Sequence, residues 1–168
     1  SNVLAGPFRI LNQKPAAVAR CQSVADVQAC LAFAQSEGIP LVARSGGHSY
    51  AGFSLTPGLM IDVSPMNQIA LDPATGLARL GGGTRNANVY EALRPPSVSV
   101  THGRCKEVGV GGLVLGGGIG FNMRLHGLTC DGLVETEMVT ADGRVLTCNA
   151  QQNSDLFWAC RGAGGGNF

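Results

Sequence analysis

Glycine clusters in two parts of the 168-residue sequence, and the first cluster constrains the fold most. It lies in the stretch RSGGHSY, residues 44–50, directly after a short apolar run. Adjacent glycines let the backbone adopt left-handed angles and leave amide N–H groups uncovered. Such groups form a nest for an anion, to which Arg44 adds positive charge and Ser45 and Ser49 add hydroxyl donors. The stretch predicts a diphosphate-binding loop after a strand, although a lone Gly-Gly pair is more typical of a surface turn.

The second cluster is GRCKEVGVGGLVLGGGIG, residues 103–120. So much bare backbone allows a flat ring system or a phosphate to lie against it. No set of these glycines has the G-x-G-x-x-G spacing, so we reject a Rossmann dinucleotide turn. Cys105 stands between Arg104 and Lys106, whose charges favour a reactive thiolate. An ordinary buried or free cysteine is the alternative interpretation.

Composition argues against several classes of protein. Twelve basic residues face eleven acidic ones, so no charge excess points to nucleic acid. Charged residues make up only 14% of the chain, which indicates that part of the surface is covered by a cofactor or by more protein. No apolar run is long enough to span a bilayer, and no secretory signal opens the sequence. The six cysteines include no C-x-x-C pair, so a zinc site has no support and the compartment stays open.

Apolar periodicity and turn signals predict an α+β fold. Ser23 and Asp26 resemble a capping box at the start of a helix that Gly38 ends. A strand precedes this helix and another follows it, which favours parallel pairing, whereas the Asp-Gly turn at 142–143 predicts a hairpin. The expected strands are 16–20, 41–44, 59–63, 68–72, 77–81, 133–140 and 144–147, the expected helices start at 23, 86 and 153, and 98–101 is extended.

Six motifs appear in one order along the chain: RSGGHSY (44–50), GRCKEVGVGG (103–112), GGGIG (116–120), HGLTCD (126–131), TADG (140–143) and DLFWACRGAGGGNF (155–168). In this order they resemble the FAD-binding part of the berberine bridge enzyme-like oxidases, within the vanillyl-alcohol oxidase flavoprotein superfamily. The resemblance implies a PCMH-type FAD-binding domain. It consists of two α+β subdomains, residues 1–80 and 81–168, with an extended FAD between them.

Family members are far longer and continue with a C-terminal substrate domain that covers the flavin and supplies the general base. We therefore expect this substrate domain to be absent here, the chain being a fragment or one chain of a split enzyme. Alone, it should not turn over substrate.

Cofactor attachment follows from the matched positions. In the family, the histidine of the first loop is bonded to the flavin 8α-methyl carbon and the cysteine of the second motif to flavin C6. These positions correspond to His48 and Cys105, so the resemblance implies a bicovalent FAD. Two bonds would fix the ring and make it a stronger oxidant. The other implied FAD-binding residues are Arg44, Ser45, Gly46, Gly47 and Ser49 at the pyrophosphate, Gly111, Gly112, Gly117, Gly118 and Gly120 along the cofactor, and the backbone near Val139 at the adenine end.

The resemblance also implies an activity: hydride transfer from an alcohol, sugar or natural-product substrate to FAD, followed by reduction of oxygen to hydrogen peroxide. The partners are then a small-molecule substrate and oxygen, with neither nucleic acid nor a membrane. Val108 matches a family position that gates oxygen, where valine goes with oxidases and leucine with dehydrogenases. Two alternatives stay open: a dehydrogenase that uses another electron acceptor, and a non-catalytic flavin-binding protein.

Expected positions can also be given for five further residues. Tyr50 either faces the substrate side of the flavin or only wedges the loop. His126 is expected to pack or form hydrogen bonds, and His102 to lie in a partly exposed loop. Trp158 is expected in the core because of its position in the closing helix, and Cys30 is expected to act as a small buried hydrophobe.

Overall fold

The computed structural model describes residues 13–100 and 102–167. Its elements alternate between strands and short helices and group into three small sheets. In chain order they are β1 (Ala17–Arg20), α1 (Val24–Ser36), β2 (Leu41–Arg44), β3 (Leu59–Asp62), β4 (Ile69–Asp72), β5 (Leu77–Leu80), α2 (Asn86–Leu93), α3 (Val110–Leu115), α4 (Met123–His126), the 3-10 helix η2 (Thr129–Gly132), β6 (Glu135–Val139), β7 (Val145–Asn149) and α5 (Ser154–Cys160).

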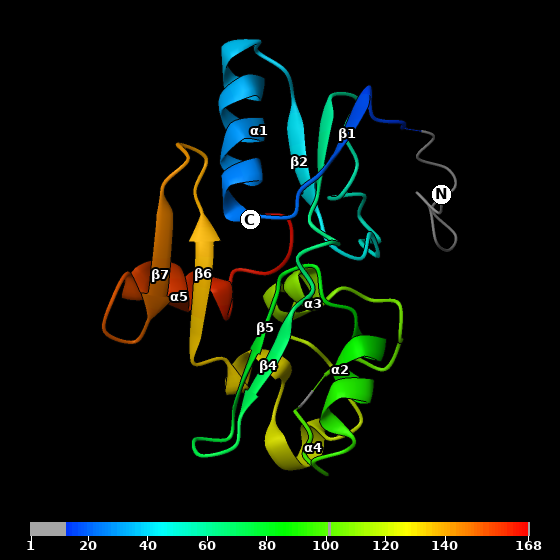
Figure 1. The fold of residues 1–168 in the computed structure, drawn as a ribbon, viewed down its shortest axis with the longest axis vertical. Helices are drawn as coiled ribbons and strands as arrows, with labels where there is room; N and C mark the ends of the chain where they lie inside the picture. Colours follow the sequence, from blue (N-terminus) through cyan, green and yellow to red (C-terminus); the bar gives the residue numbers. More distant parts are fainter. Residues whose placement is uncertain (1–12, 101, 168) are drawn as a thin grey trace.

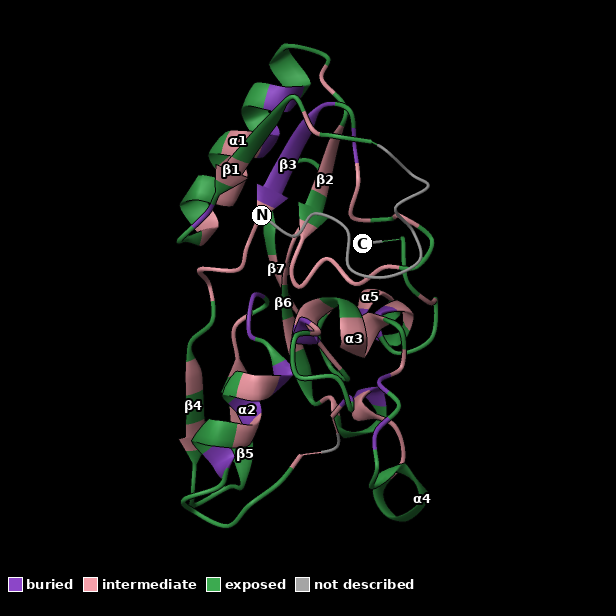
Figure 2. Cartoon of the chain, turned by 90° about the vertical axis from the view of Figure 1, so that its right-hand side faces the viewer, coloured by how far each residue is buried: buried purple, intermediate pink, exposed green. Residues whose placement is uncertain are grey.

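The N-terminal part is a parallel sheet with strand order β1-β3-β2, and α1 lies beside it (Figure 1). Helix α1 begins where the sequence predicts, because Ser23 and Asp26 form a complete capping box. The central strand β3 is the most buried element, as Figure 2 shows. Its Ile61 packs with Cys21 and Leu31 in the core between sheet and helix.

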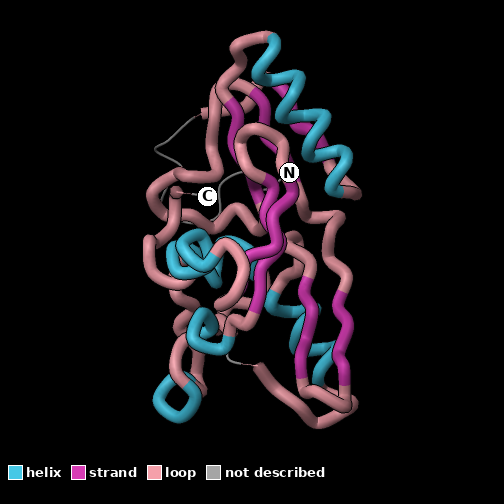
Figure 3. The backbone as a smooth tube through the Cα atoms, turned by 90° about the vertical axis from the view of Figure 1, so that its left-hand side faces the viewer, coloured by secondary structure: helices cyan, strands magenta, loops and turns pink. Residues whose placement is uncertain are grey.

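The middle part is the antiparallel hairpin β4–β5, with α2 packed against it (Figure 3). Val89 and Leu93 of α2 meet Val110 of α3 in a second buried cluster. Ile69 and Leu80 of the hairpin pack onto that cluster. The short helix α3 is thereby fixed between α2 and the rest of the chain.

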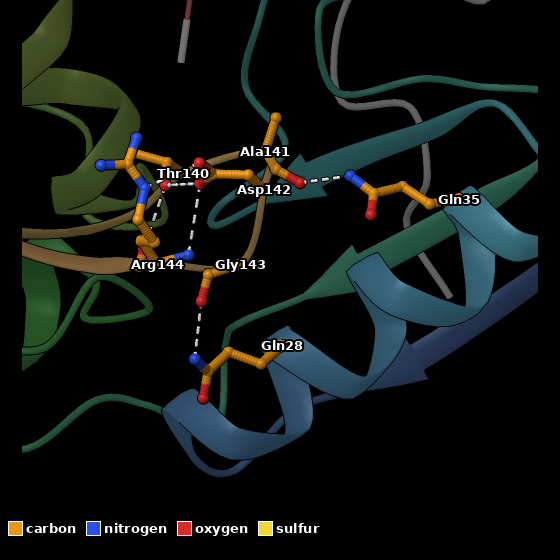
Figure 4. A network of polar contacts seen from close by, with 7 residues as sticks. All are labelled: Gln28, Gln35, Thr140, Ala141, Asp142, Gly143 and Arg144. Atoms are coloured by element: carbon orange, nitrogen blue, oxygen red, sulfur yellow. Dashed lines mark hydrogen bonds and ion pairs between the residues drawn. The ribbon is translucent and has the colours of Figure 1, made fainter.

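The C-terminal part is the antiparallel hairpin β6–β7, backed by α5. Its turn is clamped to α1 by two side chains (Figure 4): Gln28 Nε2 donates to the Gly143 carbonyl at 2.6 Å and Gln35 Nε2 donates to the Ala141 carbonyl at 2.5 Å. Val139 of β6 also packs onto the core beneath α1. The last hairpin therefore shares a core with the first sheet, although the predicted division at residue 80 assigns the two to different subdomains.

The structure confirms the predicted strands, hairpins and three longer helices to within a few residues at their ends. Residues 98–100 lie outside regular elements, and residue 101 lies outside the described residues. The expected elements do not include α3, α4 and η2, because no helix or strand was predicted for residues 109–132.

The prediction for Trp158 is wrong. Its side chain is 74% exposed, because α5 directs Phe157 and Cys160 inward and leaves position 158 on the outer face. His126 is exposed as well. Cys30 packs against the core with its Sγ 3.8 Å from that of Cys21, as expected for a small hydrophobe. All six cysteines are free thiols. Within residues 13–100 and 102–167, no helix is long and apolar enough to cross a membrane.

Candidate functional site

The first glycine loop leaves the sheet at the carboxyl end of β2. Arg44 ends that strand and pairs in register with Asp62, the last residue of β3. Ligands of open parallel sheets bind at this edge, so the loop stands where a cofactor is expected. Residues 45–49 are half-buried, whereas Tyr50 is 70% exposed.

Within this loop, Gly47 lies under the side chain of Arg44. Its φ of +70° is in the left-handed region, and a Cβ placed there would lie 2.5 Å from Nη2 of Arg44. A side chain at 47 is therefore opposed by backbone strain. Arg44 is held next to the loop backbone, which is the arrangement that binding of a phosphate anion requires.

The two glycine clusters meet at Gly46 and Gly109. A Cβ on Gly46 would lie 2.2 Å from the amide nitrogen of Gly109, and one on Gly109 would lie 2.3 Å from that of Gly46. Ser45 adds a hydrogen bond, its Oγ donating to the Gly82 carbonyl at 2.6 Å. A serine hydroxyl has one hydrogen to donate, so a phosphate would compete with Gly82 for it. The loops of His48 and Cys105 thus contact each other through their backbones.

The start of α2 holds the Cys105 loop by its carbonyl groups. The Asn86 amide donates to Val108 at 3.0 Å, the Ala87 amide donates to Lys106 at 2.9 Å, and Asn86 Nδ2 donates to Cys105 at 2.9 Å. These bonds satisfy N–H groups that have no partner within a helix. The carbonyls point inward, and the side chains of residues 105–107 are exposed.

Two further contacts hold this loop, an ion pair from Arg85 and a hydrogen bond from Tyr90. Arg85 pairs with Glu107, with Nη1 2.5 Å from Oε2. Tyr90, one turn along α2 from Asn86, donates its hydroxyl to the Gly103 carbonyl. Burial, and secondarily the nearby Cys105, raises the pKa of Tyr90, which keeps this donor protonated. His102 packs edge-on against Tyr90 at 4.2 Å between ring centroids, in a half-buried loop as predicted.

The predicted cofactor glycines differ in their surroundings. Gly111 approaches the Gly82 carbonyl, Gly118 the Thr129 side chain and Gly120 the His102 carbonyl, while Gly117 lies near Leu128. The first three of these approaches would be closer than 3 Å for an added Cβ, so packing within the chain alone explains why those residues are glycine.

Gly112 and Gly82 differ from these glycines. Both are exposed, with nothing within 4 Å of an added Cβ. Gly82 accepts a hydrogen bond from Ser45 and is approached by Gly111, so this bare backbone lies beside the first glycine loop and offers a surface onto which a flat ring can lie. The residues present therefore fit a flavin.

Three other predicted site residues, Val139, Val108 and Ser49, each contact other parts of the chain. The side chain of Val139 is in the core, so only its backbone is available to a cofactor. Val108 is half-buried, and its carbonyl is held by Asn86. Ser49 accepts a hydrogen bond from the Phe53 amide at 3.1 Å through Oγ.

Asn86 and Tyr90 were not among the predicted site residues. Helical spacing could have indicated them, because it places position 86 on the same face as Val89, Tyr90 and Leu93. A polar residue on an apolar helix face marks a buried hydrogen bond, because burial without one is costly.

Comparison with known proteins gives consistent matches. A family model described as an FAD binding domain matches residues 15–149. The FAD-linked oxidoreductase YgaK of Bacillus subtilis is 39% identical over 163 residues, which are 94% of this chain and 36% of that protein.

Solved structures show the same fold. The crystal structure of 6-hydroxy-D-nicotine oxidase from Arthrobacter nicotinovorans matches with a TM-score of 0.86 at 35% identity, over 90% of this chain and 34% of that one. Glucooligosaccharide oxidase from Acremonium strictum, whose structure concerns a 6-S-cysteinyl, 8α-N1-histidyl FAD, matches with a TM-score of 0.83 at 36% identity, over 90% and 32%. The chain spans about a third of the length of these relatives.

Proposed function

The chain belongs to the FAD-binding domains of the berberine bridge enzyme-like oxidases, and on this basis we propose that it is the cofactor-holding part of a bicovalent flavoprotein oxidase. Its two attachment residues are His48 and Cys105. The proposal also includes the other FAD-binding residues that the sequence motifs imply. Among them, Arg44 and Gly47 would bind the pyrophosphate, and Gly112 would lie against the ring system.

The contact between Gly46 and Gly109 carries this proposal. His48 follows Gly46 by two residues and Cys105 precedes Gly109 by four, so one backbone contact brings both attachment loops to one surface. If His48 and Cys105 had only structural roles, neither residue would require the loop of the other nearby. A relative at 36% identity with a 6-S-cysteinyl, 8α-N1-histidyl FAD supports the same pairing.

Bound FAD supplies the redox chemistry, because it accepts a hydride and passes the electrons to oxygen. The residues of this chain hold and shield it. Arg44 places a positive charge at the edge of the parallel sheet, and the α2 hydrogen bonds keep the Cys105 loop in one conformation. Val108 stands three residues after Cys105, where its size would set the room left for oxygen beside a bound flavin.

The substrate class follows from the relatives and stays a proposal, since the chain spans only about a third of them. They include a xylooligosaccharide oxidase, a glucooligosaccharide oxidase and an (R)-6-hydroxynicotine oxidase. We propose oxidation of a sugar, another alcohol or a natural-product amine, with hydrogen peroxide as the second product.

Oxygen consumption tests the proposal. The protein, purified at its natural full length, is given xylo- and glucooligosaccharides and 6-hydroxynicotine while oxygen and hydrogen peroxide are followed. At least one substrate should give equal amounts of peroxide formed and oxygen consumed, and a His48→Ala, Cys105→Ala double variant should lose most of this activity. A colourless, well-folded protein that consumes no oxygen would contradict it.

A further inference from the structure

Asn86 is a fully buried polar residue that neither the motifs nor the relatives' names assign to any role. It is 0% exposed and is the first residue of α2. It makes two hydrogen bonds to the loop that carries Cys105, one from its backbone amide and one from Nδ2. Its Oδ1 has no hydrogen-bond partner among the described residues.

This half-satisfied state is informative. A buried oxygen without a partner is costly, and an apolar side chain of similar size would remove the cost. Helix α2 starts with an extended backbone at Arg85, so Asn86 is not needed as the cap. What an apolar residue could not provide is the bond from Nδ2 to the Cys105 carbonyl. The value of Asn86 to the protein therefore lies in that bond.

The bond acts on the one loop residue whose position matters most for attachment. Together with the amides of residues 86 and 87, it fixes the carbonyls of residues 105, 106 and 108. The carbonyl of Cys105 is held by Asn86, and the residue itself is exposed, so the bond limits the backbone positions from which the thiol is presented.

We propose that Asn86 is a positioning residue that aims the thiol of Cys105 at the flavin; this inference rests on the proposed bicovalent attachment. In the attachment, the S–H bond of Cys105 breaks and Sγ becomes bonded to flavin C6 in place of the ring hydrogen. The two hydrogens leave with two electrons, which oxygen accepts as hydrogen peroxide. Such a step is sensitive to geometry, because a misplacement of about 1 Å can cost on the order of 100-fold in rate.

The test compares two substitutions of buried polar residues at the same end of α2. Asn86→Leu removes the Nδ2 bond and keeps the same branching and number of side-chain heavy atoms. Thr84→Val is the matched control, because Thr84 is also 0% exposed and its Oγ1 has no partner among the described residues. Each variant is made in the protein at its natural full length, and the flavin on the His48 and Cys105 peptides is quantified by mass spectrometry.

Asn86→Leu should lower the fraction of Cys105 that carries flavin by at least tenfold and leave the His48 linkage near the wild-type level, while Thr84→Val changes neither. Asn86→Ala, which cannot overfill the site, should give the same pattern if leucine is not accommodated. Unchanged Cys105 attachment would overturn the proposal, as would an equal loss at both sites, which indicates only a folding defect.

If Cys105 carries no flavin in the wild-type protein, the proposed attachment is refuted, but the role of Asn86 in holding the Cys105 loop is not. Hydrogen exchange then tests that role. Amide exchange in residues 103–109 should be at least tenfold faster in Asn86→Leu than in Thr84→Val, and equal rates in the two variants would overturn the proposal.

Discussion

Gly46 and Gly109 touch through their backbones, with each amide nitrogen within 2.3 Å of where the other residue's Cβ would stand. The contact joins the loop after β2 to the loop before α3. It is the point at which the loop of His48 and the loop of Cys105 meet.

The first prediction concerns this contact. Gly46→Ala should push the two loops apart and destabilise the protein by about 2 kcal/mol, since overpacking of a close contact costs roughly that amount. The control is Gly132→Ala, where nothing lies within 4 Å of the added methyl group. Denaturant unfolding measures both. A Gly46→Ala protein as stable as Gly132→Ala would contradict the observed contact.

Gly112 allows packing and cofactor effects to be separated. It has open space beside it and lies within α3, so Gly112→Ala should not destabilise the flavin-free protein and should raise its unfolding free energy by up to about 1 kcal/mol, because alanine favours a helix more than glycine does. If the flavin lies there, the methyl group should still reduce the flavin content measured by absorbance. Full flavin content in this variant would remove Gly112 from the cofactor surface.

The third prediction concerns oxygen. Val108→Leu should slow reoxidation of the reduced flavin by oxygen at least tenfold and leave reduction by substrate nearly unchanged, because one added methylene fills a gap in a close-packed wall. Stopped-flow absorbance measures both half-reactions. Val145→Leu, at an exposed strand position, is the control. Equal reoxidation rates in both variants would remove Val108 from the oxygen reaction, and with it the reason for preferring an oxidase over a dehydrogenase.

The fourth prediction concerns the clamp between α1 and the last hairpin. Gln28→Ala removes a hydrogen bond between residues that are 115 positions apart, and it should cost about 1 kcal/mol of unfolding free energy. Gln22→Ala, at an exposed position before α1, should cost less than about 0.5 kcal/mol. Equal effects of the two substitutions would mean that the clamp contributes nothing to stability.

The turn of that hairpin should also give a pH dependence. Hydrogen bonds from Thr140 and Arg144 lower the pKa of Asp142 from 3.8 to about 2. A depressed carboxyl pKa contributes stability that is fully present above about pH 4 and is lost as the pH falls toward 2. The Tm difference between wild type and Asp142→Asn should therefore shrink over this range. A difference that is constant with pH would contradict the assigned contacts.

Two parts of the fold, helix α1 and the hairpin β6–β7, could be predicted from local signals. Ser23 and Asp26 cap α1 through groups three residues apart, and the Asp-Gly turn at 142–143 sets its hairpin, so sequence spacing alone carries the information. Helix α3 could not be predicted in this way. Two of its six residues are glycine, which disfavours a helix, and it is stabilised by packing of Val110 on α2.

Candidate site residues could be proposed from sequence motifs, whereas the contacts that hold their loops could not. His48 and Cys105 stand in recognisable motifs, whereas the hold of Asn86 on the Cys105 loop depends on a contact across 19 residues of chain. Trp158 failed for a related reason. Helical spacing shows which residues share a face, but only the packing of α5 on β7 shows which face is buried.

The central claim is that one FAD is bonded to both His48 and Cys105. The most direct measurement is peptide mass spectrometry on a protease digest of the protein at its natural full length. The account predicts a single species with the mass of the His48 peptide, the Cys105 peptide and one FAD, less the two hydrogens lost at each bond. Recovery of the Cys105 peptide free of flavin, with its thiol open to alkylation, would contradict it.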